Sequence, residues 1–370
     1  MDGENRVLNF VKSEPVLVVS GVLALLSMFI VPPSSAYAGY INVEVLCILF
    51  CFMAVVAGIA ECGIFEKFAA EAVSDASNVR RICLSLVLIT YVGSMFITND
   101  MALITFVPLA IAVLTMAGLK DLMIPLIVMQ TVAANLGCMM TPFGSPHNLL
   151  LFASFDVSLS EFFVVMLPLI AVGTVLMVVM TLLIGKGEVE RKPVSEPINK
   201  DRPFLGVMAL MFILCIATVL ELVPYWMTLI AVLVSMLLMR PELLKKVDYG
   251  LLLTFVFLFV FTGNLTHIDF INDALESLMS WDPVMTSVIA SQFVSNVPAT
   301  ITLAGFTDDW AGLLAGVNIG GFGTPIASMA SIISLKLYQK IPGSDVKRYL
   351  LVFTGANVLM LVVLLATWYL

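Results

Sequence analysis

Charged residues are scarce in this sequence. Only 12% of its 370 residues are charged, 18 Lys and Arg against 26 Asp and Glu, whereas about 25% is typical of soluble domains. The formal net charge is −8, and no basic patch is present that would hold the phosphates of a nucleic acid. These features exclude a cytosolic enzyme, a disordered chain and a nucleic-acid-binding protein.

Cysteine and nucleotide-binding motifs are also poorly represented. The six cysteines lie mostly inside apolar runs and do not form a loop framework, so we interpret them as small membrane residues and not as disulfides or a zinc site. There is no P-loop or other ATP-binding signature. The sequence therefore predicts no enzyme and no organic cofactor.

Hydrophobic residues are abundant, at 61% of the chain, and the mean hydropathy is +1.07. Apolar runs that are candidates for membrane segments cover residues 16–31, 43–60, 82–97, 101–117, 122–140, 162–184, 204–220, 224–239, 249–263, 284–306, 311–335 and 349–370. The first run resembles a signal peptide with a cleavage site at 36–38, but we interpret it as an uncleaved span because the topology requires it. The fold class is an all-α polytopic membrane protein.

The basic residues predict how these runs cross the membrane. All 18 lie between the runs or at their edges, and cytoplasmic loops collect Lys and Arg. With the basic segments inside, 82–117 enters and returns from the cytoplasm, and 283–306 enters and returns from outside. We therefore expect about nine spans plus two re-entrant hairpins, with a cytoplasmic N-terminus and an extracytoplasmic C-terminus.

The two halves of the sequence resemble each other. The segment 96–99 (Phe-Ile-Thr-Asn) matches 293–296 (Phe-Val-Ser-Asn), and Asn-Leu-Gly at 135–137 with Thr-Pro at 141–142 matches Asn-Ile-Gly at 318–320 with Thr-Pro at 324–325. The order and spacing of the matches predict an inverted repeat. Its parts are an N-terminal repeat at 1–184 (hairpin 82–117, broken helix 122–154), a cytoplasmic linker at 185–203, and a C-terminal repeat at 204–370 with one extra helix (hairpin 283–306, broken helix 311–335).

Inverted repeats with broken helices are typical of secondary transporters, which bind their solute near the midplane. Thr-Pro fits the start of a helix, whose free N–H groups favour an anion, and the carbonyls before each break suit Na+. The expected solute-binding residues are Asn99, Thr141, Pro142, Asn296, Thr324 and Pro325. The expected ion-coupling residues, with Na+ as the candidate metal ion at the hairpin tips and breaks, are Thr98, Asp100, Asn135, Gly137, Ser295, Asn318 and Gly320.

Asp100 is the most informative single residue, because a carboxylate within the membrane indicates a function. It is a candidate to carry a proton or bind a cation, and it is equally a candidate N-cap for the helix at 101–117. His147 is a weaker candidate for a titrating group, and a coupling role for it is not favoured. Cys138 is a candidate for contact with a soft metalloid, although a packing role is favoured.

At the hairpin tips and Thr-Pro breaks the chain resembles the ion transporter superfamily. This group includes arsenite-permease-like proteins, sodium/proton antiporters of the NhaD type and divalent anion/sodium symporters. Segments 96–107, 141–148 and 291–302 resemble the small bacterial YbiR-like branch. The resemblance implies an elevator-type transporter of the inner membrane that forms homodimers.

The hairpin tips depart from the symporter pattern. In the dicarboxylate symporters each tip carries Ser-Asn-Thr, whose Asn and Thr bind carboxylate, whereas here the triplets are 98–100 (Thr-Asn-Asp) and 295–297 (Ser-Asn-Val). A carboxylate at Asp100 repels a dicarboxylate unless it is protonated or paired with a cation. This difference favours a proton- or cation-coupled mechanism.

The sequence thus predicts a gradient-driven transporter in the lipid bilayer that moves a small-molecule or inorganic anion, coupled to Na+ or H+. The alternatives are a Na+/H+ antiporter in which Asp100 alternates between proton and sodium, or an arsenite-type efflux permease. A channel or membrane receptor is a third possibility, which the paired hairpins argue against. Solute identity, direction of transport and stoichiometry stay open.

Overall fold

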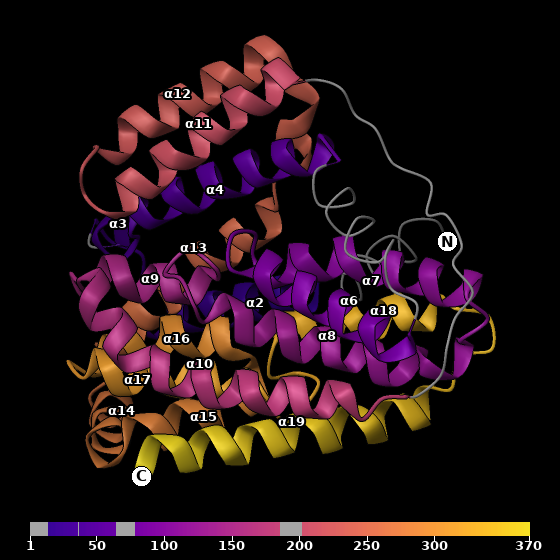
Figure 1. The fold of residues 1–370 in the computed structure, drawn as a ribbon. Coiled ribbons are helices and arrows are strands. Elements are labelled where there is room, and N and C mark those ends of the chain that lie inside the picture. The colour runs from indigo at the N-terminus through magenta and orange to yellow at the C-terminus, as the bar shows by residue number, and fades with distance from the viewer. Residues whose placement is uncertain (1–13, 36, 64–77, 186–201) are drawn as a thin grey trace, which may run out of the picture.

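The structure is a computed structural model that describes residues 14–35, 37–63, 78–185 and 202–370 (Figure 1). The basic linker expected at 185–203 lies almost wholly outside these residues. The helices of the first part are α2 (Pro15–Ile30), α3 (Tyr37–Tyr40), α4 (Val43–Glu61), α6 (Val79–Ser94), α7 (Asn99–Met116), η1 (Lys120–Leu122), α8 (Met123–Cys138), α9 (Pro146–Ser154) and α10 (Leu159–Leu182). Those of the second part are α11 (Arg202–Val219), α12 (Tyr225–Met239), η2 (Pro241–Lys246), α13 (Tyr249–Leu265), α14 (Asp269–Trp281), α15 (Pro283–Val294), α16 (Asn296–Leu303), η3 (Ala304–Phe306), α17 (Trp310–Gly320), α18 (Met329–Gln339) and α19 (Val346–Tyr369).

Many of these helices are long and apolar enough to cross a bilayer. Among the described residues six qualify individually, and a seventh span results if α13 and α14, which meet at 103°, are counted as one bent span. Several shorter apolar helices, such as α12 and α17, accompany them. The predicted all-helical, multi-pass architecture is therefore confirmed. Helix α14 was not expected, because it lies between the apolar runs at 249–263 and 284–306 that the sequence indicated.

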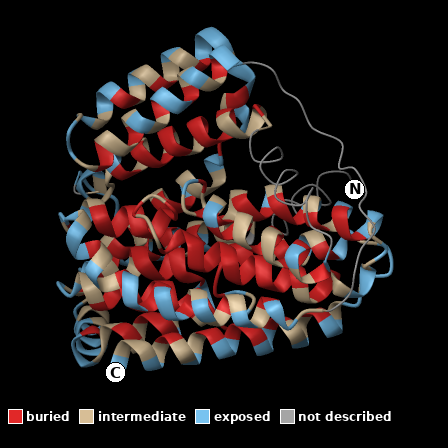
Figure 2. Cartoon of the chain, viewed as in Figure 1, coloured by how far each residue is buried: buried red, intermediate tan, exposed pale blue. Residues whose placement is uncertain are grey.

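The helices are arranged around a buried centre. Helices α4, α11 and α12 contact one another and form a layer along one side of the molecule, and α13 packs against α2 (Figure 1). Helices α6 and α7 contact each other and α8, while α15 contacts both α16 and α17. Buried residues concentrate in the middle of the molecule, and α8 is buried along nearly its whole length (Figure 2).

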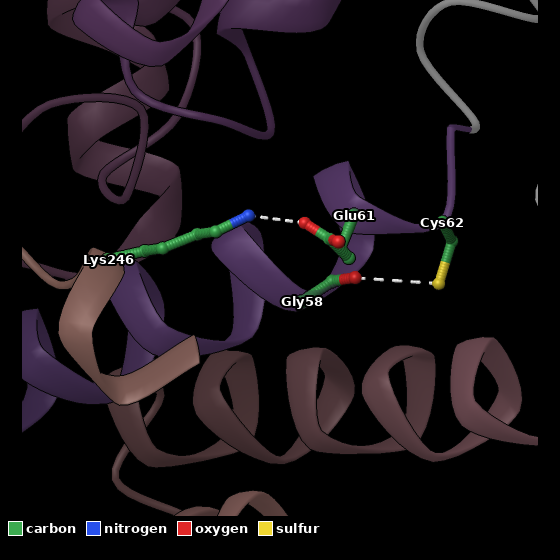
Figure 3. A network of polar contacts seen from close by, with 4 residues as sticks. All are labelled: Gly58, Glu61, Cys62 and Lys246. Carbon is green, nitrogen blue, oxygen red and sulfur yellow. Dashed lines mark hydrogen bonds and ion pairs between the residues drawn. The ribbon is translucent and has the colours of Figure 1, made fainter. Parts of the chain in front are cut away.

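An ion pair on the surface joins the α4 layer to the chain that leads into α13. Lys246 at the end of η2 contacts the carboxylate of Glu61 at the end of α4, and the thiol of Cys62 donates to the carbonyl of Gly58 at 3.4 Å (Figure 3). The Lys246 side chain is 54% exposed, so this pair contributes at most about 1 kcal/mol. The Lys246–Glu61 pair therefore adds little to the stability of the contact between η2 and the α4 layer.

Three predicted helix starts are wrong. Helix α7 begins at Asn99 and Thr98 takes its cap position, so Asp100 lies inside the first turn and is not the N-cap. Thr141 and Thr324 do not cap the restarted helices either, because α9 starts at Pro146 and α18 at Met329. In both cases a serine four residues after the threonine takes the cap position, and the residues between extend the break.

Glycines allow the first hairpin to approach the broken helix closely. A Cβ added to Gly137 of α8 would lie 2.1 Å from both the carbonyl oxygen of Tyr91 and the hydroxyl of Ser94 on α6. A Cβ on Gly320 of α17 would lie 2.8 Å from the Cβ of Ser291 on α15. Each helix that leads into a break therefore needs a glycine where it crosses the first arm of its hairpin.

We expect Gly137→Ala to destabilise the protein by about 1–3 kcal/mol, because the added methyl meets backbone atoms that cannot move aside. Gly355→Ala in α19 is the matched control, since its Cβ would meet nothing within 4 Å. Survival of detergent-solubilised protein after heating, followed by fluorescence-detected size exclusion, measures the difference. Equal survival of the two variants contradicts the close approach.

Candidate functional site

Two breaks interrupt helices near the centre of the molecule. The first break (residues 139–145) separates α8 from α9, and the second break (residues 321–328) separates α17 from α18. The turn between α6 and α7 and the residue between α15 and α16 form the two hairpin tips. The structure brings the two asparagines of the tips, Asn99 and Asn296, to one cavity.

That cavity has a volume of about 40 Å³, enough for a bare ion or a few waters. Its polar lining comes from both tips, from the end of the second break and from the N-terminal ends of α2 and α13, and comprises Glu14, Asn99, Asp100, Asp248, Thr254, Asn296 and Ser328. Three of these side chains are carboxylates, and no Lys or Arg is among the lining residues that the structure describes. The local charge therefore favours a cation or a proton over an unpaired anion.

Asp100 stands between this cavity and a second one of about 130 Å³, which it lines together with Thr98, Ser145, Lys246 and Asp248. Its Oδ1 atom is buried and has no hydrogen-bond partner among the described residues. A buried carboxylate oxygen that faces a cavity without a donor is a ready ligand for a cation or a proton. The predicted coupling residue thus lies in a position suited to that role.

Glu14 and Asp248 are members of the site that the sequence analysis missed. A Cβ on Gly250 would lie 3.2 Å from Asp248 Oδ1 and 3.4 Å from Glu14 Oε2, so the two carboxylates share one corner of the cavity. Burial and the neighbouring charge of Asp248 raise the pKa of Glu14, and Lys336 opposes this shift. The sequence signal that could have pointed to Asp248 is an Asp directly before an apolar run, which is typical of an N-cap. The structure bears out this cap, because Leu251 N donates to Asp248 Oδ1 at 2.8 Å.

Asn135 links the first half to the second. Its Oδ1 accepts from Asn99 Nδ2 at 3.1 Å and from Ser328 Oγ at 3.1 Å, and its Nδ2 donates to the carbonyl of Gly321 at 3.2 Å. One buried amide therefore holds the first hairpin tip and both ends of the second break together. Both Asn135 and Ser328 are almost fully buried.

Asn318 makes the reciprocal link. Its Nδ2 donates to Asn148 Oδ1 at 2.7 Å, and its Oδ1 lies 3.3 Å from His147 Nε2. Asn148 and His147 both belong to α9, the helix that follows the first break. Because Asn318 Oδ1 can only accept, the His147 Nε2 carries the proton in this contact. His147 is therefore part of the junction between the halves, and Cys138 donates its thiol to the carbonyl of Asn135 at 3.1 Å.

The predicted threonines of the breaks contact the hairpins. Thr141 Oγ1 donates to the carbonyl of Met95 at 2.6 Å, and Thr324 Oγ1 donates to the carbonyl of Gln292 at 3.0 Å. Neither threonine, nor the proline after it, lines the two cavities that contain Asp100. Their solute-binding role stays a prediction, and in this conformation they fasten the hairpins to the breaks.

Ser295 lies apart from this cluster. It has a positive φ of 73° and lines an apolar cavity of about 260 Å³ with Phe293 and Pro298. Ser145 and Ser328, by contrast, lie in the cluster, although the sequence analysis did not select them. Both stand four residues after a Thr-Pro threonine, and Ser145 precedes a proline, which is a signal for a helix start that could have been found.

We expect Asn135→Ala to lower the stability by about 1–3 kcal/mol, because the carbonyl of Gly321 and the donors of Asn99 and Ser328 lose their partner in a buried place. Asn272→Ala, which removes an exposed hydrogen bond to Glu276 on α14, is the control. The midpoint of thermal inactivation in detergent is the measurement. A midpoint as high for the Asn135 variant as for the control argues against the link.

Comparison with known proteins gives consistent matches over most of the chain. The family model described as "Citrate transporter" matches residues 8–317. A protein of Methanocaldococcus jannaschii named as an uncharacterized transporter is 34% identical over 289 residues, which cover 78% of this chain and 79% of that protein. Inner membrane protein YbiR of Escherichia coli is 28% identical over 318 residues, 84% of each chain. A 46 kDa membrane protein of Mycobacterium leprae is 24% identical over 89% of this chain and 86% of its own length.

Proposed function

Because the chain belongs to the citrate transporter family, within the ion transporter superfamily, we propose that it is a secondary active transporter that moves a small anion or oxyanion, coupled to Na+ or H+. The observation that carries the proposal is the cavity between the two hairpin tips, which gathers Asn99, Asn296 and the unpartnered carboxylate oxygen of Asp100 at the junction of the two breaks. The asparagines would bind the solute, and Asp100 would carry the coupling ion.

The chain's two halves would be inverted repeats, with hairpins that enter from opposite faces of the inner membrane. Supporting this, equivalent positions make equivalent contacts: Thr141 with the carbonyl of Met95, and Thr324 with that of Gln292. The distribution of Lys and Arg supports a cytoplasmic N-terminus and an extracytoplasmic C-terminus. Nine spans and two hairpins would follow.

Movement of the hairpins past the α4 layer would give alternating access, and the transporter would form homodimers. An aromatic cluster marks the contact that must break: Phe143 of the first break stacks on Phe52 of α4 at 5.5 Å between ring centroids and meets Phe212 of α11 edge-on at 6.1 Å. Such rings slide apart without leaving a buried polar group unpaired, because the contact is apolar.

A Na+/H+ antiporter is the second candidate, and the lining of the cavity favours it. Glu14, Asp100 and Asp248 line it, with no basic residue among the described lining residues, which suits exchange of Na+ for H+ with no anion. The two candidates differ in whether proton movement requires an added anion.

Asp100→Asn tests the coupling role that both candidates assign to Asp100. We expect protein in liposomes loaded with a pH-sensitive dye to move protons under a Na+ gradient only through the Asp100 carboxylate, so the variant abolishes this movement. Asp121→Asn, at an exposed position in η1, is the control and is expected to keep the wild-type rate.

Proton movement in wild type without any substrate anion supports the antiporter. Movement only after one of a panel of anions is added supports the anion carrier and identifies the solute class. Equal rates in wild type and the Asp100 variant contradict the coupling role in both candidates.

The proposed movement is tested by joining Phe52→Cys to Phe143→Cys in a variant whose native cysteines are replaced. We expect oxidation of this pair, once loss of both free thiols confirms the cross-link, to stop transport and reduction to restore it, because the cross-link fixes the first break to the α4 layer. A pair placed within one helix, Val358→Cys with Val362→Cys of α19, is the control. Undiminished transport by the oxidised Phe52–Phe143 pair contradicts the movement.

A further inference from the structure

Gln292, in the last turn of α15, reaches into the second break. Its Nε2 donates to the carbonyls of Gly320 and Phe322, at 2.9 and 3.0 Å. Its Oε1 accepts from Thr324 N at 2.9 Å. A single amide thus satisfies two carbonyls and one N–H group that the interruption of the helix leaves without helical partners.

The two carbonyls that Gln292 holds are of the kind that bind Na+ in broken helices. Oxygen atoms freed at the end of a half-helix carry partial negative charge and can surround a small hard cation. An amide N–H₂ between them supplies partial positive charge at the same place. With Gln292 in this position, the Gly320 carbonyl is already occupied by a donor from the protein.

The first break lacks this amide. Met95 stands at the position that matches Gln292, one residue before the Phe-x-x-Asn segment of its hairpin, and a thioether has no N–H to donate. No side-chain donor among the described residues reaches the carbonyls of Gly137 or Met139, which match Gly320 and Phe322.

The carbonyl between these two positions has the same kind of partner in both halves, although the donor comes from the same half in the first break and from the other half in the second. The carbonyls of Cys138 and Gly321 each accept from an asparagine, Asn148 or Asn135, at 3.1 and 3.2 Å. The two breaks therefore differ in the side chain at this position, Met95 or Gln292, and so in the groups offered to a cation. The hydrogen bond from the break threonine to the hairpin carbonyl is present in both.

We propose that Gln292 occupies, as a built-in amide, the place that a coupling cation would take in the second break, so that cation binding is confined to the first half of the protein. This inference rests on the proposed function, because it assumes that a cation drives transport. It assigns Gln292 a specificity-determining role: the side chain limits how many cations accompany each solute.

The chemistry of the position predicts what a substitution does. Gln292→Glu replaces the donating Nε2 by a carboxylate oxygen opposite the carbonyls of Gly320 and Phe322. These oxygens repel one another unless a cation lies between them. Gln292→Met removes the amide and reproduces the chemistry of the first break.

The test is thermal unfolding of the purified full-length protein in detergent at pH 8, in NaCl and in choline chloride of equal ionic strength. We expect Na+ to raise the melting temperature of the Gln292→Glu variant by about 3–5 °C more than that of wild type, as for a newly created ligand site. Gln292→Met is expected to melt lower than wild type in choline and to recover part of the loss in Na+. Asn272→Asp, on an exposed face of α14, adds a carboxylate elsewhere and controls for charge.

Recovery of the Gln292→Glu variant only when Na+ is present during solubilisation also supports the proposal. Equal melting of this variant in both salts, or failure to recover it in either, overturns the proposal, because Na+ then does not replace the amide. The assay measures binding without transport, so it stands even if the liposome experiment with Asp100→Asn disproves the proposed function.

Discussion

The structure depends on one constraint: backbone polar groups inside a bilayer must find partners within the protein. Two helices are interrupted near the centre of this molecule, which leaves carbonyl and N–H groups without helical partners. Every such group that finds no partner costs several kcal/mol. The arrangement of asparagines, serines and glycines around the breaks follows from that cost.

Partners for the breaks come from both halves of the chain. Within their own halves, Asn148 donates to the first break and Gln292 to the second. Asn135 donates to the second break, and Asn318 contacts the helix that follows the first. Part of the stabilisation at the breaks therefore requires both halves. A local cost is thereby turned into a contact between halves, and this contact lies next to the cavity that contains Asp100. In this way the site and the interface between the halves have a common physical origin.

Much of the helical plan could be predicted from the sequence, because apolar length and basic flanks are local signals. The tips and breaks could be found as well, because short sequence segments match between the two halves. Asn99 matches Asn296 at the tips, and Asn135 matches Asn318 before the breaks. Other features depend on contacts between distant segments. Gln292 forms hydrogen bonds with residues about 30 positions later in the chain. Glu14, before α2, lies close to Asp248, which is the N-cap of α13. Contacts between residues so far apart in the sequence cannot be predicted from a local sequence pattern.

The differences between the halves carry as much information as the matches. The first tip has Asp100 where the second tip has Val297. The first hairpin has Met95 where the second has Gln292. The first difference adds a negative charge to the first half, and the second supplies amide donors to the second half. Both changes make the first half more attractive to a cation and the second half less so. Two independent changes in the same direction are expected if one half binds the ion and both bind the solute, which is how a symmetric scaffold can couple unlike species.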